Sequence, residues 1–159
     1  MPKRKRTETS VDIRYIAIDT GKIATGVAVV EASAVIHIAL IETSTKDKPT
    51  AFVAHVAADL DSFVQDGTVV LLEKMYNANW TVIHRNKALR EHFQAKGATV
   101  RYVNPMQKRG VTARKSNERK AQSVAAAREL LKGDMLEKFE ALSRKHDIAD
   151  ALLMISSLQ

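Results

Sequence analysis

The sequence predicts an α/β fold in which a mixed β-sheet is flanked by helices. Apolar segments rich in β-branched residues open the chain, which predicts a three-strand antiparallel meander. Later apolar segments alternate with stretches of helical periodicity, and this order predicts further strands that run parallel to their neighbours. With 159 residues and 45% hydrophobic content, the chain is long enough for one domain of ordinary size.

The predicted meander is made of IRYIAID (13–19), TGVAVVE (25–31) and VIHIALIETS (35–44). Turn-capable positions separate the three segments, as expected for consecutive antiparallel strands. A helix is predicted next, over 49–65, because its apolar residues recur near helical spacing. The proline at its start fits, since the first amide of a helix needs no partner within the helix.

Strands and helices are then predicted to alternate. TVVLLEKMY (68–76) is a nearly continuous apolar run, as expected for a strand buried on both faces. A helix is expected over 80–96, where Gly97 ends it, and ATVRYVNP (98–105) is the next strand. After a basic loop, two helices are predicted, over about 117–131 and from about 143 onward. The predicted order is β-β-β-α-β-α-β-α-α.

Positive charge is concentrated in two segments of this basic chain, whose net charge is +7. Residues 3–6 read KRKR, and residues 101–120 contain seven basic residues against Glu118 alone. Clustered positive charge favours a phosphate backbone as the partner, although a solvated helix face is the alternative for the second segment. The candidates for nucleic-acid binding are Lys108, Arg109, Arg114, Lys115, Arg119 and Lys120.

The basic N-terminal segment, residues 1–10, is predicted to be a disordered arm that precedes a single domain over 11–159. Its KRKR run is typical of a nuclear-import signal, of a solvated tail or of an arm that grips phosphate. The chain has no cysteine, which excludes a disulfide framework and a thiolate zinc site. The same absence of cysteine is compatible with the intracellular location that we expect. No apolar run approaches the ~20 residues that a membrane span needs, so we expect no membrane partner.

Four carboxylates occupy positions that need a physical explanation. Asp19 ends a buried-looking strand, and Glu73 interrupts the apolar run of another. An ionised carboxylate in such a place is costly unless it is paired or holds a cation. Asp147 and Asp150 are spaced i, i+3 and therefore share one helix face, where like charges repel. Mg²⁺ and Mn²⁺ prefer oxygen ligands of this kind, so a shared metal site resolves the conflict.

Each acid also has a simpler explanation when it is taken singly. Asp19 could cap a turn, Glu73 could pair with Lys or Arg, and the last two could form a solvated helix face. Their order along the chain is more informative, because acids on the first strand, on the strand after the first helix and on the final helix are what an RNase H-like nuclease needs.

Three segments carry a more specific resemblance: IAIDTGKIATGVAVVE (16–31), VVLLEKMYNAN (69–79) and HDIADALLMI (146–155). They resemble the metal-ligand motifs of the RuvC-like Holliday-junction resolvases, and the poxvirus and mitochondrial branch is the most similar. The resemblance implies an RNase H-like fold and a Mg²⁺-dependent nuclease that resolves four-way DNA junctions. The segment KMYNAN (74–79) lacks the Gln-rich neighbourhood expected in several relatives, which leaves the details of junction recognition open.

The same resemblance assigns roles to individual residues. Asp19, Glu73, Asp147 and Asp150 are expected to bind two Mg²⁺ ions, for which Mn²⁺ can substitute. Such enzymes are homodimers that cut symmetrically, and the resembling branch suggests a viral or organellar origin. Two metal ions can activate a water and stabilise the leaving oxygen during in-line attack on a phosphodiester.

Three further residues are secondary candidates. His146 adjoins Asp147 and could assist proton transfer, although a local hydrogen bond is the more common role of such a histidine. Tyr76 and Trp80 could stack on opened bases, since stacking on an aromatic ring contributes roughly 1 to 3 kcal/mol. For Trp80, a place in the core is the favoured alternative.

Rival functions fit some of the same residues. Asp19-Thr20-Gly21 after an apolar strand resembles the active-site turn of retroviral aspartic proteases, but the predicted helices argue against an all-β protease. The turn also resembles the phosphate-binding hairpin of actin-like ATPases, which need two lobes and a longer chain. An RNase H-type ribonuclease acting on RNA–DNA hybrids or structured RNA stays open, because substrate shape is recognised elsewhere. So does a non-catalytic nucleic-acid-binding module.

Overall fold

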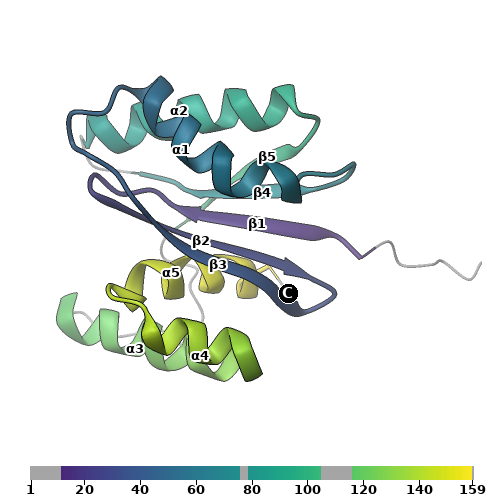
Figure 1. Ribbon diagram of the computed structural model, residues 1–159, viewed down its shortest axis with the longest axis vertical. Helices are drawn as coiled ribbons and strands as arrows, with labels where there is room; N and C mark the ends of the chain where they lie inside the picture. Colours follow the sequence, from purple (N-terminus) through teal and green to yellow (C-terminus); the bar gives the residue numbers. More distant parts are fainter. Residues whose placement is uncertain (1–11, 76–78, 105–115, 159) are drawn as a thin grey trace, which may run out of the picture.

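The computed structural model describes residues 12–75, 79–104 and 116–158, which form a β-sheet between two helical layers (Figure 1). The five strands lie in the order β3-β2-β1-β4-β5. The first three pair antiparallel, whereas β4 runs parallel to both β1 and β5, so the predicted mixed sheet is confirmed. The strands are β1 (Arg14–Asp19), β2 (Ala24–Glu31), β3 (Ala34–Glu42), β4 (Val69–Glu73) and β5 (Thr99–Val103).

The two faces of the sheet carry different helices (Figure 1). Helices α1 and α2 cover one face, and α5 lies on the other, where α3 packs against α5 and α4 contacts β3. None of the helices in the described ranges combines the length and apolar character needed to span a bilayer. The helices are α1 (Pro49–Leu60), the 3-10 turn η1 (Asp61–Phe63), α2 (Trp80–Ala95), α3 (Ser116–Leu130), α4 (Gly133–Ala141) and α5 (Lys145–Ser156).

Alternating side chains of the strands supply two separate cores. Ile16, Ile18 and Leu72 face α1 and α2, where they pack in one buried cluster with Phe52 and Phe93. The residues between them face α5, and they belong to a second buried cluster that includes Ala17, Leu71, Ile148 and Leu152. This alternation follows from the two-residue repeat of a strand, and it fixes which face each strand residue serves.

One helix was not predicted. The sequence suggested two helices after the basic loop, but the described residues contain three, because α4 (Gly133–Ala141) lies between the other two. This helix is short, it begins at a glycine with φ of 54° and no side chain caps it. It is held mainly by tertiary burial of Phe139, which is fully buried in the core on the α5 side. Such a helix gives little local signal.

Candidate active site

Asp19 and Glu73 end two neighbouring parallel strands, so both carboxylates lie at the same end of the sheet. The register between β1 and β4 pairs Ile18 with Leu72, and the next residue on each strand is one of the two acids. Neighbours at matching positions of parallel strands project from the same face. Both side chains are partly exposed, and the Oε2 atom of Glu73 is buried.

The face on which these acids project is the one covered by α5. Side chains alternate along a strand, so Asp19 shares its face with Ala17, and Glu73 shares its face with Leu71. Both of these neighbours belong to the core beneath α5. The two strand acids therefore lie on the same side of the sheet as the helix that carries Asp147 and Asp150.

Gly26 lets the start of α5 approach the sheet. This glycine is the register partner of Asp19 on β2. A Cβ atom placed on it would lie 2.3 Å from the backbone C and O atoms of Asp147. No side chain fits into that space. Because glycine has none, the helix backbone can contact the strand at this position. The contact brings Asp147 next to the strand pair that carries Asp19.

The first acid of α5 has two basic neighbours. Arg144 Nε donates to Asp147 Oδ2 at 2.9 Å, and His146 Nε2 lies 3.3 Å from Asp147 Oδ1. The Asp147 side chain is only 13% exposed, and it occupies the first turn of the helix, where the helix dipole favours a negative charge. Asp150 follows one turn later and is partly buried. His146 is thus a neighbour of a candidate metal ligand, and both of its expected roles stay predictions.

Asn86 on α2 connects the two strand ends from the opposite face of the sheet. Its Oδ1 accepts a hydrogen bond from Thr20 Oγ1 at 2.6 Å, and its Nδ2 donates to the backbone carbonyl of Glu73 at 3.2 Å. The side chain is buried, with 4% of the residue exposed. One amide therefore contacts the residue after Asp19 and the backbone of Glu73.

Arg85, the preceding residue, holds the loops beside this end of the sheet. Its Nη1 donates to the carbonyls of Gly21 and Lys22 at 2.7 and 2.8 Å, and its Nη2 donates to the carbonyl of Ser44 at 2.8 Å. The guanidinium also stacks on Phe52, 4.6 Å from the ring centroid. Burial lowers the pKa of Arg85, and the Asp47 carboxylate opposes that shift. An arginine nevertheless keeps its charge at neutral pH.

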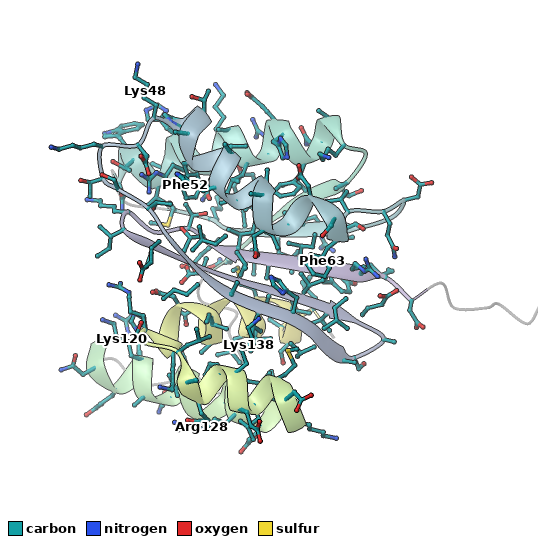
Figure 2. The ribbon with its side chains drawn as sticks, viewed as in Figure 1. Lys48, Phe52, Phe63, Lys120, Arg128 and Lys138 are labelled. Atoms are coloured by element: carbon teal, nitrogen blue, oxygen red, sulfur yellow. The ribbon has the colours of Figure 1, made fainter. Side chains whose placement is uncertain are left out.

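A basic groove borders the start of α5. The groove has a volume of about 450 Å³ and runs between α3 and the segment that joins α4 to α5. Figure 2 shows Lys120 and Arg128 on this α3 side of the molecule. Its position beside Asp147 links the candidate metal ligands to a surface that suits phosphate. The basic side chains that line it are Lys120, Arg128, Arg144, Lys145 and His146.

The other predicted site residues have mixed outcomes. Arg119 is exposed on α3. Trp80 is 63% exposed at the first position of α2, so its favoured assignment to the core was wrong. The remaining predicted residues, and the N-terminal arm, lie outside the described part of the chain. These residues are Tyr76, Lys108, Arg109, Arg114 and Lys115.

The donor chemistry of this end of the sheet fits a divalent metal, because four carboxylates from two strands and one helix supply the oxygen ligands that Mg²⁺ prefers. Within the described ranges, however, no three His, Cys, Asp or Glu side chains are grouped closely enough to hold a metal ion as they stand. The backbone brings Asp19, Glu73 and Asp147 together, while Asp147 is engaged by Arg144 and His146. Metal binding therefore stays a prediction.

Comparisons of the sequence with protein-family models and with curated proteins found no match. Solved structures do match. A Fowlpox virus resolvase in complex with Holliday junction DNA has a TM-score of 0.65 at 20% identity, over 91% of this chain and 95% of that one. RuvC of T. thermophilus with a Holliday junction substrate has a TM-score of 0.60 at 18% identity, over 91% and 93%. A second Thermus thermophilus RuvC structure gives 0.60 at 17%, over 91% and 94%.

This chain has the RNase H-like fold of the RuvC-type resolvases. The predicted fold resemblance is thereby confirmed, including the similarity to a poxvirus resolvase. Within this resolvase fold, the acidic end of the sheet is the candidate active site of the chain.

Sequence reasoning missed three residues that shape this site, and two of them left a signal. Gly26 lies inside a β-branched strand segment, which is typical of a close backbone approach. Asn86 occupies a core position in the helical spacing of Val82, Leu89 and Phe93. Arg85 left none, because an arginine on a helix is usually exposed.

Proposed function

We propose that this chain is a metal-dependent endonuclease that resolves four-way DNA junctions. The convergence of acids from β1, β4 and α5 on one face, at one end of the sheet, is the observation that carries the proposal. A protein that only binds DNA gains nothing from collecting carboxylates beside a phosphate-binding groove, since like charges repel. A site that uses a cation to bring carboxylates and phosphate together explains the arrangement.

Asp19, Glu73, Asp147 and Asp150 are the residues that would hold the metal, in our proposal two Mg²⁺ ions that Mn²⁺ can replace. When bound, the metal supplies an activated water and stabilises the leaving oxygen of the phosphodiester. The carboxylates supply the negative charge that retains the cations, and Glu73 contributes an oxygen already enclosed by protein. His146 orients Asp147 through their 3.3 Å contact.

The basic groove beside α5 would position the substrate. Lys120, Lys145 and Arg144 line it, and their charges can neutralise phosphates of one DNA arm while the scissile phosphate lies at the carboxylates. Arg144 has two partners available, the Asp147 carboxylate and an incoming phosphate. Phosphate contacts fix the orientation of a nucleic acid without selecting sequence, as recognition of a branched structure requires.

The choice of a four-way junction over other nucleic acids is supported by two structural neighbours, each of which was solved with a Holliday junction. One chain contributes one set of acids, and resolution of a junction needs two cuts. We therefore propose that a homodimer supplies two sites that nick symmetrically. Hydrolysis of RNA–DNA hybrids by the same site is the main rival activity.

The test combines substrates with one charge-removing variant. Purified protein is incubated with a labelled four-way junction, a matching duplex and an RNA–DNA hybrid, each with Mg²⁺ or EDTA. We expect paired, symmetric, Mg²⁺-dependent nicks in the junction. Asp19→Asn should reduce the cleavage rate by at least about 100-fold, because even residues behind a metal ligand contribute 10- to 100-fold, and should leave junction binding intact. Asp66→Asn is the matched control, since this exposed acid precedes β4 at the opposite end of the strand from Glu73.

Three results would change the assignment. Preferential cleavage of the hybrid would make the protein a ribonuclease. Cleavage that persists in EDTA, or in Asp19→Asn at the wild-type rate, would remove the metal site. Tight junction binding with no cleavage of any substrate would leave a nucleic-acid-binding module.

A further inference from the structure

We propose that Asn86 is a positioning residue that aligns the Asp19 and Glu73 carboxylates by tying together the ends of β1 and β4. The inference rests on the proposed nuclease function for its catalytic consequence, although the structural tie can be tested without catalysis. It assigns a role in the site to the helix on the opposite face of the sheet from α5.

The last register pair of β1 and β4 lies one residue before the two acids. This pair is Ile18 with Leu72, and each acid is the next residue. Asp19 pairs instead with Gly26 of β2, and Glu73 with Val103 of β5. The acids therefore lie one residue beyond the last register pair of β1 and β4, where a side chain that contacts both strand ends can add to the alignment set by the ladder.

Asn86 bridges these two strand ends with its side chain. Its amide accepts from Thr20 Oγ1 on the β1 side at 2.6 Å and donates to the Glu73 carbonyl on the β4 side at 3.2 Å. The chemistry fixes the orientation of the amide, because a backbone carbonyl only accepts and must face the NH₂ group. Asparagine supplies the donor and the acceptor from one rigid group, whereas an ionised aspartate supplies acceptors alone.

The part of α2 that carries Asn86 is fixed in position by its own contacts. Asn86 is buried on α2, and the adjacent Arg85 makes hydrogen bonds of 2.7 and 2.8 Å to the carbonyls of Gly21 and Lys22, directly after Thr20. Leu89 and Phe93, further along the same face of the helix, are fully buried in the core. The amide therefore transmits a fixed position of α2 to both strand ends.

Loss of the bridge should affect chemistry more than binding. A displacement of about 1 Å in a reacting geometry can cost roughly 100-fold in rate. We expect Asn86→Ala to lower kcat by roughly 10- to 100-fold, to raise the Mg²⁺ concentration needed for half-maximal rate, and to leave junction Kd within about twofold of wild type. Thr20→Val should produce a smaller loss, and Thr20→Ser, which keeps the hydroxyl, should recover most of it.

Two measurements separate this role from a general loss of stability. Amide hydrogen exchange, read on peptides that cover 16–22 and 69–75, should rise selectively in Asn86→Ala at these strand ends. Mn²⁺ affinity of the DNA-free protein, read by paramagnetic broadening or calorimetry, should fall. His92→Ala is the matched control, because it removes another polar contact of the same helix, 2.8 Å from His92 Nε2 to Asp61 Oδ1 of η1, that involves neither strand end. It should lower Tm yet keep wild-type kcat and Mn²⁺ affinity below its melting transition.

The results also separate this inference from the proposed function. If wild-type protein cuts no nucleic acid, the nuclease proposal fails, and selective exchange at the strand ends still supports the structural tie. If wild type cuts junctions while Asn86→Ala keeps its kcat, Mn²⁺ affinity and exchange pattern, the positioning role is overturned and the nuclease stands. Non-additive losses in Asn86→Ala and Thr20→Val combined would support the shared hydrogen bond, and full additivity would contradict it.

Discussion

The two faces of the sheet hold the same acidic end by different physical means. On the α5 side the contact is steric, because the Asp147 backbone occupies the space where Gly26 lacks a side chain. On the α2 side the contact is polar, because Asn86 and Arg85 reach the strand ends through hydrogen bonds. One helix brings acids to the site, and the other aligns acids that the strands already carry.

This difference predicts which kind of substitution each face of the sheet tolerates. The α5 helix buries apolar side chains such as Ile148 and Leu152, so its position depends on volume. The α2 helix buries two polar side chains whose value depends on matched partners. Added atoms should therefore damage the α5 face, and lost hydrogen bonds should damage the α2 face.

The largest expected effect comes from adding one methyl group at the steric contact. In Gly26→Ala, the new Cβ would lie 2.3 Å from the Asp147 backbone, which cannot move aside as a flexible side chain would. We expect a loss of about 3 kcal/mol in the free energy of unfolding, at the upper end of overpacking effects. Junction cleavage should fall with it, since α5 must shift. Denaturant unfolding and cleavage assays measure the two quantities.

Gly67→Ala is the control for that substitution. This glycine has φ of 81°, and no atom lies within 4 Å of the place that a Cβ would take, so the change costs only the backbone strain of about 1 to 2 kcal/mol. It precedes β4 at the opposite end of the strand from Glu73, and cleavage should survive. Equal stability and equal activity in both variants would contradict a specific α5 contact.

A smaller effect is expected when the polar face loses its arginine. Arg85→Met keeps much of the apolar stem but leaves the carbonyls of Gly21, Lys22 and Ser44 without their charged donor. Replacing a buried charge with an apolar group can be neutral when both partners change together, but here the acceptors remain. We therefore expect a loss of about 2 to 3 kcal/mol by chemical denaturation.

Lys87→Met provides the comparison for this prediction, because it removes a charge from an exposed position of the same helix. Its effect should stay within about 0.5 kcal/mol. A stability of Arg85→Met as high as that of Lys87→Met would show that the hydrogen bonds to the loops contribute nothing net.

The same contrast explains what the sequence revealed and what it did not. The strand pattern and the parallel pairs were predicted and are confirmed, because burial leaves a periodic signal. Asp19 and Glu73 were singled out because a charge stands out in an apolar strand. Their metal-binding role stays a prediction.

The polar contacts that Arg85 and Asn86 of α2 make with the strand ends and loops could not be predicted in the same way. Arg85 is among the largest fully buried side chains, yet its partners are carbonyls of loops that lie 41 to 64 residues away in sequence. Only the folded chain shows that these groups meet. The short helix α4 was missed because burial of Phe139, rather than local propensity, is what stabilises it.

The smallest effect is expected at an ion pair on the outer helices of the α5 side. Arg128 of α3 donates to both carboxylate oxygens of Glu140 on α4, and both side chains are more than two-fifths exposed. The pair lowers the pKa of Glu140 and raises that of Arg128. Any stabilisation is therefore present at neutral pH and is lost as pH falls through the lowered pKa of Glu140.

Exposed pairs contribute little, so Glu140→Gln should leave Tm nearly unchanged at pH 7 in ordinary salt, and any difference from wild type should vanish in acid. A large drop in Tm at neutral pH would mean that α3 and α4 are held by this pair rather than by their apolar contacts with the core on the α5 side.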